Sequence, residues 1–217
     1  MLLSAYSGLI GHLPYLDQAF ETKKETWDRE HYQSFKDFDS FLQKAFTTSD
    51  TVIFSRADLF DKVNEDIRAA IFSIIFWGYP RNMRGNSFKS ILSALPDIEK
   101  MLSGNRELDT AGFAGICEKL NGKGMGLSTL SKFLYFFGFR LEGYKCLILD
   151  SRIIDVLNAN TFAELKMNET ITEWNKEDYY PRYLKMMEDI AQKNDYSVDQ
   201  LELFLFQFGK NLKSVNS

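Results

Sequence analysis

The strongest constraint on this chain is the run from Asp66 to Trp77, which is apolar on nearly every side of the helix that it predicts. A helix of that kind is stable in water only when other elements pack around it. The run is followed by Gly78-Tyr79-Pro80, and glycine and proline are typical of a helix stop. We therefore predict a central, buried helix inside a globular fold.

Most of the remaining sequence also predicts helix. Apolar residues recur at three- and four-residue spacing, while strand-like alternation is scarce. The amphipathic segments are residues 32–46, 110–120, 127–137, 179–192 and 198–212. The prediction is a compact all-α fold in one domain, residues 1–217, either as a single body or as two lobes with an active-site cleft between them.

The composition excludes several classes of protein. Two cysteines, Cys117 and Cys146, cannot build a disulfide scaffold, which favours a reducing compartment. Two histidines, His12 and His31, leave little for a histidine metal site or a Ser-His-Asp triad. No apolar run reaches the roughly 18 residues of a membrane span, and the N-terminus lacks the features of a signal peptide. We expect a cytoplasmic monomer with no metal site and no membrane partner.

The net charge of −4 hides an uneven distribution. Residues 17–66 carry twelve acidic and seven basic side chains. Residues 79–95 carry three basic side chains and no acidic one, and residues 118–145 carry five basic against two acidic. A basic patch on an acidic protein is compatible with DNA binding, because the field near the contact matters more than the total charge.

The segment from Leu120 to Lys132 has the pattern of a helix-hairpin-helix, predicted at about residues 113–137. Gly122, Gly124 and Gly126 stand two apart between two predicted helices, and glycines permit positive φ and close backbone approach. The start of the second helix presents free N–H groups and the positive end of the helix dipole, which suit a phosphate. The alternative is a glycine-rich turn between two packed helices, with no ligand.

Further residues fit contacts to a nucleic-acid backbone. Ser128 and Thr129 add hydroxyl donors at the hairpin, and Lys123 adds charge. The loop after the central helix contributes Arg81, Asn82 and Arg84, with no acidic residue near them. For these arginines, a merely solvated loop is an equally good interpretation.

Asp150 is the candidate catalytic group. It follows the apolar residues 147–149 and precedes a predicted helix that ends at Leu157. One interpretation is a helix N-cap, which contributes about 1 kcal/mol. The other is a carboxylate held at the lip of a pocket by the apolar segment behind it.

Asp150 stands 24 residues after Gly126. The segment Gly124 to Thr129, followed at that spacing by the segment Leu147 to Ile153, resembles the helix-hairpin-helix DNA glycosylase superfamily, in particular its 8-oxoguanine-glycosylase-like branch of small bacterial proteins. The resemblance covers roughly residues 66–157. It implies that the protein binds double-stranded DNA, flips out a damaged or modified base and hydrolyses the N-glycosidic bond with Asp150 as the catalytic carboxylate. It implies no metal or organic cofactor, although a monovalent cation on the hairpin carbonyls fits the family.

The resemblance also bears on the mechanism. Bifunctional members of the superfamily carry a lysine two residues after the second hairpin glycine, and Ser128 stands there in this chain. We therefore predict a monofunctional enzyme that uses water. Lys132 lies one helical turn further on the same face, as a phosphate contact or a substitute nucleophile. If Gly122 and Gly124 are the true hairpin pair, the position falls on Gly126 and still holds no amine. No cysteine follows Cys146, so a C-terminal four-cysteine iron–sulfur cluster cannot form.

Three aromatic residues are candidates for the base pocket, namely Trp77, Tyr79 and Phe136. Stacking of a base on an aromatic ring contributes roughly 1–3 kcal/mol. The alternative, that Trp77 is a core residue, is favoured because aromatic residues at helix ends usually pack. The excised base stays open between 8-oxoguanine, a hypermodified cytosine of viral DNA and another base, and repair and antiviral roles stay open as well. The rival functions are a non-catalytic DNA-binding protein and a protein-interaction module.

Overall fold

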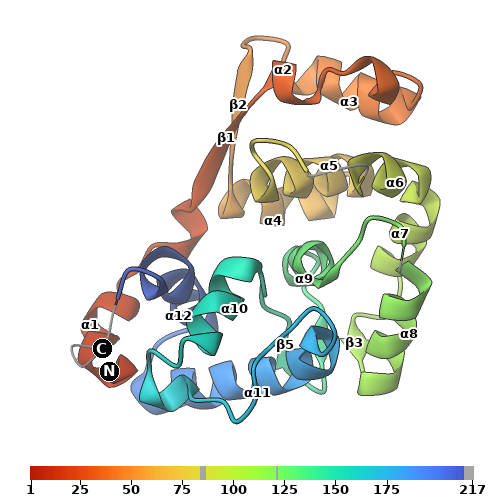
Figure 1. Cartoon of the computed structure of the whole chain (residues 1–217). Helices are drawn as coiled ribbons and strands as arrows, with labels where there is room; N and C mark the ends of the chain where they lie inside the picture. Colours follow the sequence, from red (N-terminus) through yellow and green to blue (C-terminus); the bar gives the residue numbers. More distant parts are fainter. Residues whose placement is uncertain (84–86, 121, 213–217) are drawn as a thin grey trace.

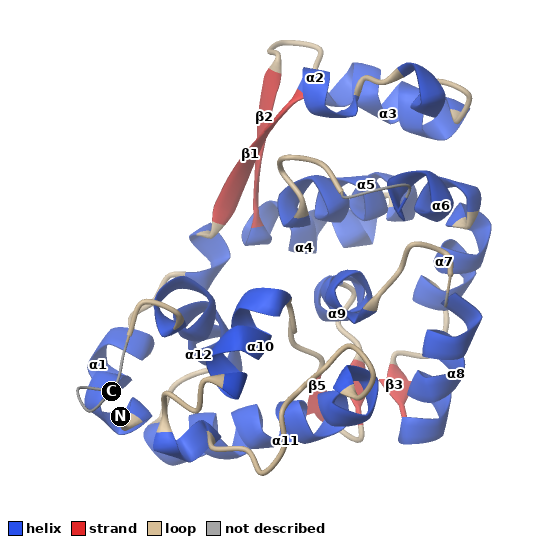
Figure 2. Cartoon of the chain, in the orientation of Figure 1, coloured by secondary structure: helices blue, strands red, loops and turns tan. Residues whose placement is uncertain are grey.

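The computed structural model describes residues 1–83, 87–120 and 122–212. Twelve α-helices dominate these residues, together with two small sheets (Figures 1 and 2). The prediction of a helical fold is therefore right in its main feature, but an all-α class is too strict. The expected backbone contact Arg84 lies outside the described residues.

The first sheet pairs β1 (Ala19–Lys23) with β2 (Thr51–Ser55) in antiparallel register, Phe20 opposite Phe54. The β-branched and aromatic residues of β2 suit a strand. Ser55 ends β2 and caps α4 (Arg56–Glu65), because its hydroxyl accepts the Asp58 amide while the Asp58 carboxylate accepts the Ser55 amide. The capping box therefore turns the chain from the sheet into a helix and fixes the position of Arg56.

The central helix is α5 (Ile67–Gly78), as predicted. It begins at Asp66, whose side chain accepts the amides of Arg68 and Ala69, and residues 70–77 are all buried. Around it pack α3 (Lys36–Ala45), α4, α9 (Leu127–Phe136) and the β1–β2 sheet. Trp27 stacks on Phe76 with a ring separation of 4.4 Å. Burial on all sides is what an apolar helix of this kind requires.

The remaining helices surround this centre (Figure 1). They are α1 (Ser7–Ile10), α2 (Lys24–Trp27), α6 (Ser87–Ser93), α7 (Leu95–Leu102), α8 (Thr110–Leu120), α10 (Ser151–Asn158), α11 (Lys176–Asn194) and α12 (Val198–Phe204). Short 3₁₀ turns cover Leu3–Tyr6, Tyr15–Asp17, Glu30–Tyr32 and Ala163–Leu165, and a π-helical turn, η5, covers Leu205–Gly209. Figure 1 shows α11 on the opposite side of α9 from α5, so α9 lies between two helical layers.

The second sheet joins three two-residue strands, β3 (Glu107–Leu108), β4 (Arg140–Leu141) and β5 (Tyr144–Lys145). β4 pairs parallel with β3 and antiparallel with β5. The sheet ties the segment before α8 to the segment after α9. It therefore closes the helix pair that contains the glycine-rich turn.

That turn connects α8 to α9, and its glycines have different roles. Gly122 and Gly124 have φ of 75°, in the left-handed region that favours glycine. A Cβ at Gly124 would stand 2.3 Å from the Ser87 carbonyl oxygen, so the turn packs directly against the start of α6. Gly126 has φ of −74° and precedes α9 with open space around it, and no side chain caps the first turn of α9. The amides of Leu127 and Ser128 are therefore left without a hydrogen bond among the described residues, whereas the Thr129 amide donates to the Gly126 carbonyl at 2.9 Å.

The two glycines give a matched test of this packing. We expect Gly124→Ala to lower the free energy of unfolding by more than about 1 kcal/mol, because it adds a clash to an unfavourable φ. Gly126→Ala, which meets neither obstacle, serves as the control and should change stability much less. Urea unfolding followed by circular dichroism measures both, and equal effects of the two substitutions would contradict this account.

Candidate functional site

A cavity of about 280 Å³ lies between the end of α5 and the starts of α9 and α10. Its volume is close to the lower end of the range for small-molecule sites, roughly 300–1,000 Å³. Its wall comes from segments far apart in sequence: Phe20, Arg56, Trp77, Gly78, Tyr79, Pro80, Ser128, Lys132, Ile148, Asp150, Ser151, Arg152, Glu202 and Phe206. Asp150, Lys132, Ser128, Trp77 and Tyr79, all singled out from the sequence, therefore meet in one cavity.

Asp150 is both the N-cap of α10 and part of the cavity wall. Its Oδ1 accepts hydrogen bonds from the amides of Arg152 (3.0 Å) and Ile153 (3.1 Å). Oδ2 has no hydrogen bond to any residue that the structure describes. One carboxylate oxygen thus fixes the orientation of the side chain, while the other is left for a ligand. The two interpretations of Asp150 from the sequence are compatible.

The apolar segment behind Asp150 is pinned from two sides. Tyr180 and Tyr183 of α11 donate to the carbonyls of Leu147 (2.7 Å) and Ile148 (3.0 Å). From α9, Ser131 accepts the Leu149 amide at 3.1 Å. Burial raises the pKa of both tyrosines well above the usual value, so they stay neutral donors. These bonds hold the start of α10 against the cavity.

Lys132 extends into the cavity and not toward solvent. Its side chain is 4% exposed, and its Nζ donates to the Ser128 carbonyl at 2.8 Å and to the Ser128 hydroxyl at 3.1 Å. The ammonium lies 5.2 Å from the centre of the Tyr79 ring, within the range of a cation–π contact. A Cβ at Gly78 would stand 2.8 Å from Lys132 Cδ, so the glycine leaves room for this chain. The placement favours a role inside the cavity over a phosphate contact.

The three aromatic residues predicted for the base pocket differ in their burial and in their contact with the cavity. Trp77 is 3% exposed and donates to the Gln18 carbonyl at 3.2 Å, so it is a core residue with one edge on the cavity. Tyr79 is half-buried, and its hydroxyl lies 2.6 Å from the Thr129 hydroxyl. Phe136 packs edge-on behind Trp77 and is not among the cavity residues. Phe20 and Phe206, which the sequence analysis missed, line the cavity instead.

Several expected backbone contacts are already engaged within the protein. Lys123 forms an ion pair with Asp97 at 2.6 Å, and this hydrogen bond lowers the pKa of the Asp97 carboxyl. The Thr129 hydroxyl is taken by Tyr79. Arg81 is exposed, and Asn82 adopts a positive φ of 83° with its carboxamide oxygen on the Met83 amide. The amides at the start of α9 are the groups of the hairpin that a ligand could still use.

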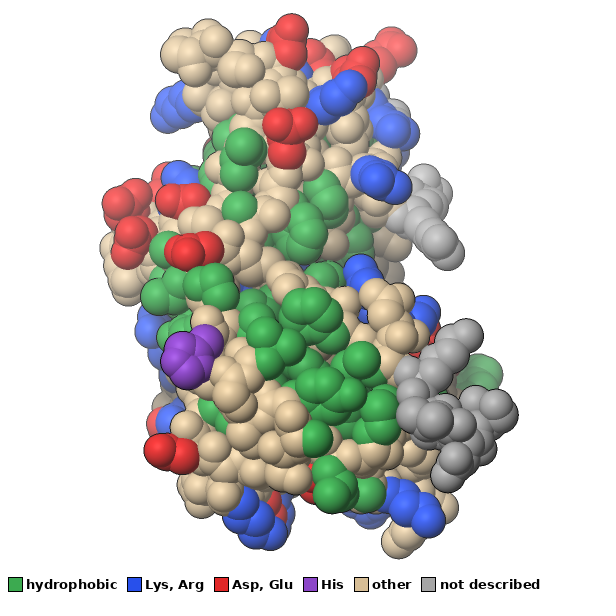
Figure 3. All heavy atoms as spheres, turned by 90° about the vertical axis from the view of Figure 1, so that its left-hand side faces the viewer, with side chains coloured by type: hydrophobic (Ala, Val, Ile, Leu, Met, Phe, Trp, Pro, Cys, Tyr) green, Lys and Arg blue, Asp and Glu red, His purple; other side chains and the backbone are tan. Residues whose placement is uncertain are grey.

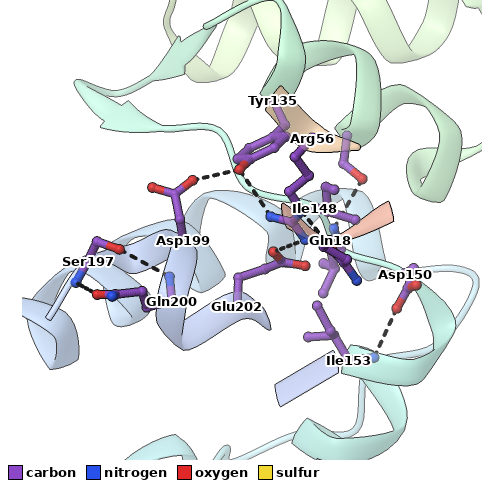
Figure 4. A network of polar contacts seen from close by, with 12 residues as sticks. Gln18, Arg56, Tyr135, Ile148, Asp150, Ile153, Ser197, Asp199, Gln200 and Glu202 are labelled. Atoms are coloured by element: carbon purple, nitrogen blue, oxygen red, sulfur yellow. Dashed lines mark hydrogen bonds and ion pairs between the residues drawn. The ribbon is translucent and has the colours of Figure 1, made fainter. Parts of the chain in front are cut away.

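The floor of the cavity contains charged residues that sequence reasoning missed. Arg56 is 0% exposed and forms an ion pair with Glu202 at 2.6 Å (Figure 4). Burial lowers the pKa of Arg56, but the Glu202 carboxylate and the Tyr135 hydroxyl outweigh that effect, so its net pKa lies above the usual value. The available sequence signal was a single acidic residue inside the apolar run 201–205 of a terminal helix.

Figure 3 shows one face of the molecule, which carries α1 and the β1–β2 sheet. Apolar side chains gather over its middle, and charged side chains lie mainly at its edge. No helix among the described residues is long and apolar enough to cross a membrane. Within the same residues, no three His, Cys, Asp or Glu side chains are grouped to hold a metal ion.

Comparison with known proteins identifies the family. The family described as "Putative 8-oxoguanine DNA glycosylase OGG-like protein" matches residues 13–206, which include every described residue of the cavity wall. No curated protein and no solved structure matches the chain. The family match confirms the resemblance drawn from the glycine-rich hairpin and the Asp150 segment. The chain belongs to the OGG-like family of 8-oxoguanine DNA glycosylase-like proteins.

Proposed function

We propose that the protein is a DNA glycosylase that flips a damaged or modified base into the cavity and hydrolyses its N-glycosidic bond. The observation that carries the proposal is the geometry of Asp150, whose Oδ1 caps α10 and whose Oδ2 has no partner among the described residues. Family membership supports DNA as the partner and base excision as the reaction class.

In this mechanism, Asp150 acts on the sugar. Breaking the C1′–N bond builds positive charge on the deoxyribose, and a nearby carboxylate stabilises that charge and orients the attacking water. The cap bonds keep Oδ2 in place before substrate arrives, so little reorganisation is needed during the reaction. The flipped base would stack among Tyr79, Phe20 and Phe206, with Trp77 behind them and Phe136 supporting Trp77.

The hairpin would hold the DNA backbone through main-chain groups. Gly126 leaves space for a phosphate at the start of α9, where the amides of Leu127 and Ser128 make no hydrogen bond among the described residues, and the Thr129 amide donates to the Gly126 carbonyl. Gly124 shapes the turn, and Lys123 would contribute charge only when it leaves Asp97. Arg81, Asn82 and Arg84 follow α5 and would support the distorted duplex.

The proposal needs no metal or organic cofactor, and a monovalent cation at the hairpin stays a prediction. We also propose that the protein is a cytoplasmic monomer. Cys117 and Cys146 are both unpaired, as a reducing compartment would keep them, and burial raises the pKa of each thiol to about 12. The base is proposed as 8-oxoguanine or a modified base of viral DNA, in repair or antiviral defence respectively. A screen of duplexes with different modified bases, scored for abasic sites, separates the two.

Asp150→Asn tests the mechanism. We expect base release to be abolished while DNA binding stays nearly intact, because asparagine keeps the N-cap and loses only the charge. The measurements are alkali-induced strand breaks at abasic sites and a gel-shift titration. Asp155→Asn, on the same helix but paired with Lys210 outside the cavity, is the control and should remain active.

Unchanged excision by Asp150→Asn would overturn this mechanism. DNA binding without base release by the wild-type protein would instead indicate the non-catalytic DNA-binding function. DNA affinity that does not fall with added salt, or no affinity at all, would favour a protein-interaction module.

A second candidate function is lyase activity, and the position of Lys132 favours it. The Lys132 ammonium lies beside Ser128, the position at which bifunctional relatives carry a lysine, and it shares the cavity with Asp150. A neutral amine there could attack the sugar and form a Schiff base.

Borohydride trapping decides between water and Lys132. With water as nucleophile, we expect the wild-type protein to leave abasic sites and form no covalent complex with DNA. A trapped complex that disappears in Lys132→Gln would establish the lyase instead. Gel electrophoresis of the trapped mixture, run under denaturing conditions, makes the comparison.

A further inference from the structure

The ionic cluster under the cavity does more than fill the core. Arg56 comes from α4, Tyr135 from α9 and both Asp199 and Glu202 from α12, so the cluster joins three helices. Figure 4 shows Glu202 reaching from α12 toward Arg56, with Gln18 and Ile148 nearby. Glu202 is 0% exposed but belongs to the cavity wall together with Asp150. It therefore forms part of the floor.

Arg56, Tyr135 and Asp199 each form hydrogen bonds within the cluster, whereas Glu202 forms none. Arg56 donates to Gln18 Oε1 at 2.6 Å and to the Tyr135 hydroxyl at 3.0 Å, and it forms an ion pair with Glu202 Oε2 at 2.6 Å. Tyr135 in turn donates to Asp199, which also pairs with Lys145 at 2.7 Å. Both carboxylate oxygens of Glu202 are buried, and neither has a hydrogen-bond partner among the described residues. The Glu202 carboxylate is thus held by its ion pair with Arg56 through Oε2, and Oε1 has no partner among the described residues.

An unpartnered buried carboxylate oxygen is unfavourable for stability. A buried donor or acceptor without a partner loses its hydration and gains nothing in return, and apolar side chains of similar volume often replace buried ion pairs without loss of stability. The neighbours of Glu202 in the chain, Leu201 and Leu203, are buried apolar residues, so this position could pack without a charge. A ligand that enters the cavity would supply the missing partner.

We propose that Glu202 is the general acid of the excision reaction and that its Oε1 delivers a proton to the departing base. The proposal rests on the glycosylase function given above and assigns a second carboxyl group to the same cavity. Asp150 would act on the sugar, and Glu202 would act on the base.

The step balances in protons and electrons. When the C1′–N bond breaks, its electron pair goes to the base nitrogen, and the base takes the proton from Glu202 Oε1 and leaves neutral. Water forms the new C1′–O bond and loses a proton to Asp150. Solvent then returns one proton to Glu202 and removes one from Asp150, which restores the starting state.

The surroundings of Glu202 suit this role. Desolvation by burial raises the pKa of Glu202 to about 6, Arg56 opposes that rise, and the carboxylates of Asp150 and Asp199 add to it. Other polar groups near the cluster are Lys145 on β5, Tyr183 on α11, and Lys132 and Arg152 in the cavity wall. A carboxyl group with a pKa near 6 holds a proton in part of the molecules close to neutral pH, as a general acid requires.

The pH profile of Glu202→Gln tests the proposal. The acid form of Glu202 declines above its pKa of about 6, so the wild-type rate should fall with rising pH and approach a tenfold loss per pH unit on the alkaline side. Glu202→Gln should lower the rate at pH 6 by at least about 10²-fold and remove that slope. Glu202→Asp, which keeps a carboxyl group, should keep the slope at a reduced rate. Single-turnover excision of 8-oxoguanine from a duplex, with protein below saturation, gives the rates.

The controls separate a structural role from an acid role. Glu188→Gln makes the same chemical change on α11, away from the cavity, and should behave as wild type. If Glu202→Gln fails to fold because Arg56 is left unpaired, the double variant Arg56→Gln, Glu202→Gln carries no unpaired charge and takes its place. Circular dichroism and DNA binding establish that each variant is folded.

The outcomes keep this inference apart from the proposed function. An active wild-type enzyme whose alkaline slope survives in Glu202→Gln would overturn the general acid. A lower rate with the same slope would mean that Glu202 only supports the cavity, which also overturns it. A wild-type protein that excises no base from any duplex in the screen would overturn the glycosylase function itself.

Discussion

The burial of residues 70–77 in α5 is the constraint on which the rest of the structure depends. Because residues 70–77 are covered on every side, α4, α9 and the β1–β2 sheet must pack around them. The end of the helix is thereby fixed against the start of α9, where Gly78 leaves room for the Lys132 side chain. Core packing and the cavity wall thus share residues, and Trp77 belongs to both. A base held there would be contacted by rigid elements.

In the proposed mechanism, Asp150 serves stability and chemistry at the same time. A carboxylate that caps a helix is held by backbone amides, which gives it a defined direction without any additional residue. Hydrogen bonds from Tyr180 and Tyr183 and to Ser131 fix the backbone of the apolar residues before it, so the position of Asp150 at the start of α10 is fixed as well. Pre-organised groups of this kind stabilise developing charge with little reorganisation.

Local features of the sequence were predictable, and long-range pairings were not. The central helix followed from its uniform apolar character, and the cap at Asp150 followed from its position before a helical stripe. The two-residue strands were missed because they are too short to show alternation. The Arg56–Glu202 pair joins α4 to α12, and neither residue has a neighbour in sequence that indicates its partner. Lys123 was expected to be available for DNA, but its pairing with Asp97 depends on how α7 packs beside the hairpin.

The lysine side chains of the hairpin already have partners within the protein, and this affects how an acidic protein could bind DNA. Lys123 is neutralised by Asp97, and Lys132 is turned into the cavity, so the hairpin offers phosphate mainly its backbone amides and the dipole of α9. Main-chain amides at a helix N-terminus can bind a phosphate and fix its position without a charged side chain. A net charge of −4 is then no obstacle, because affinity would come from an everted base in an aromatic cavity together with a phosphate at one helix terminus.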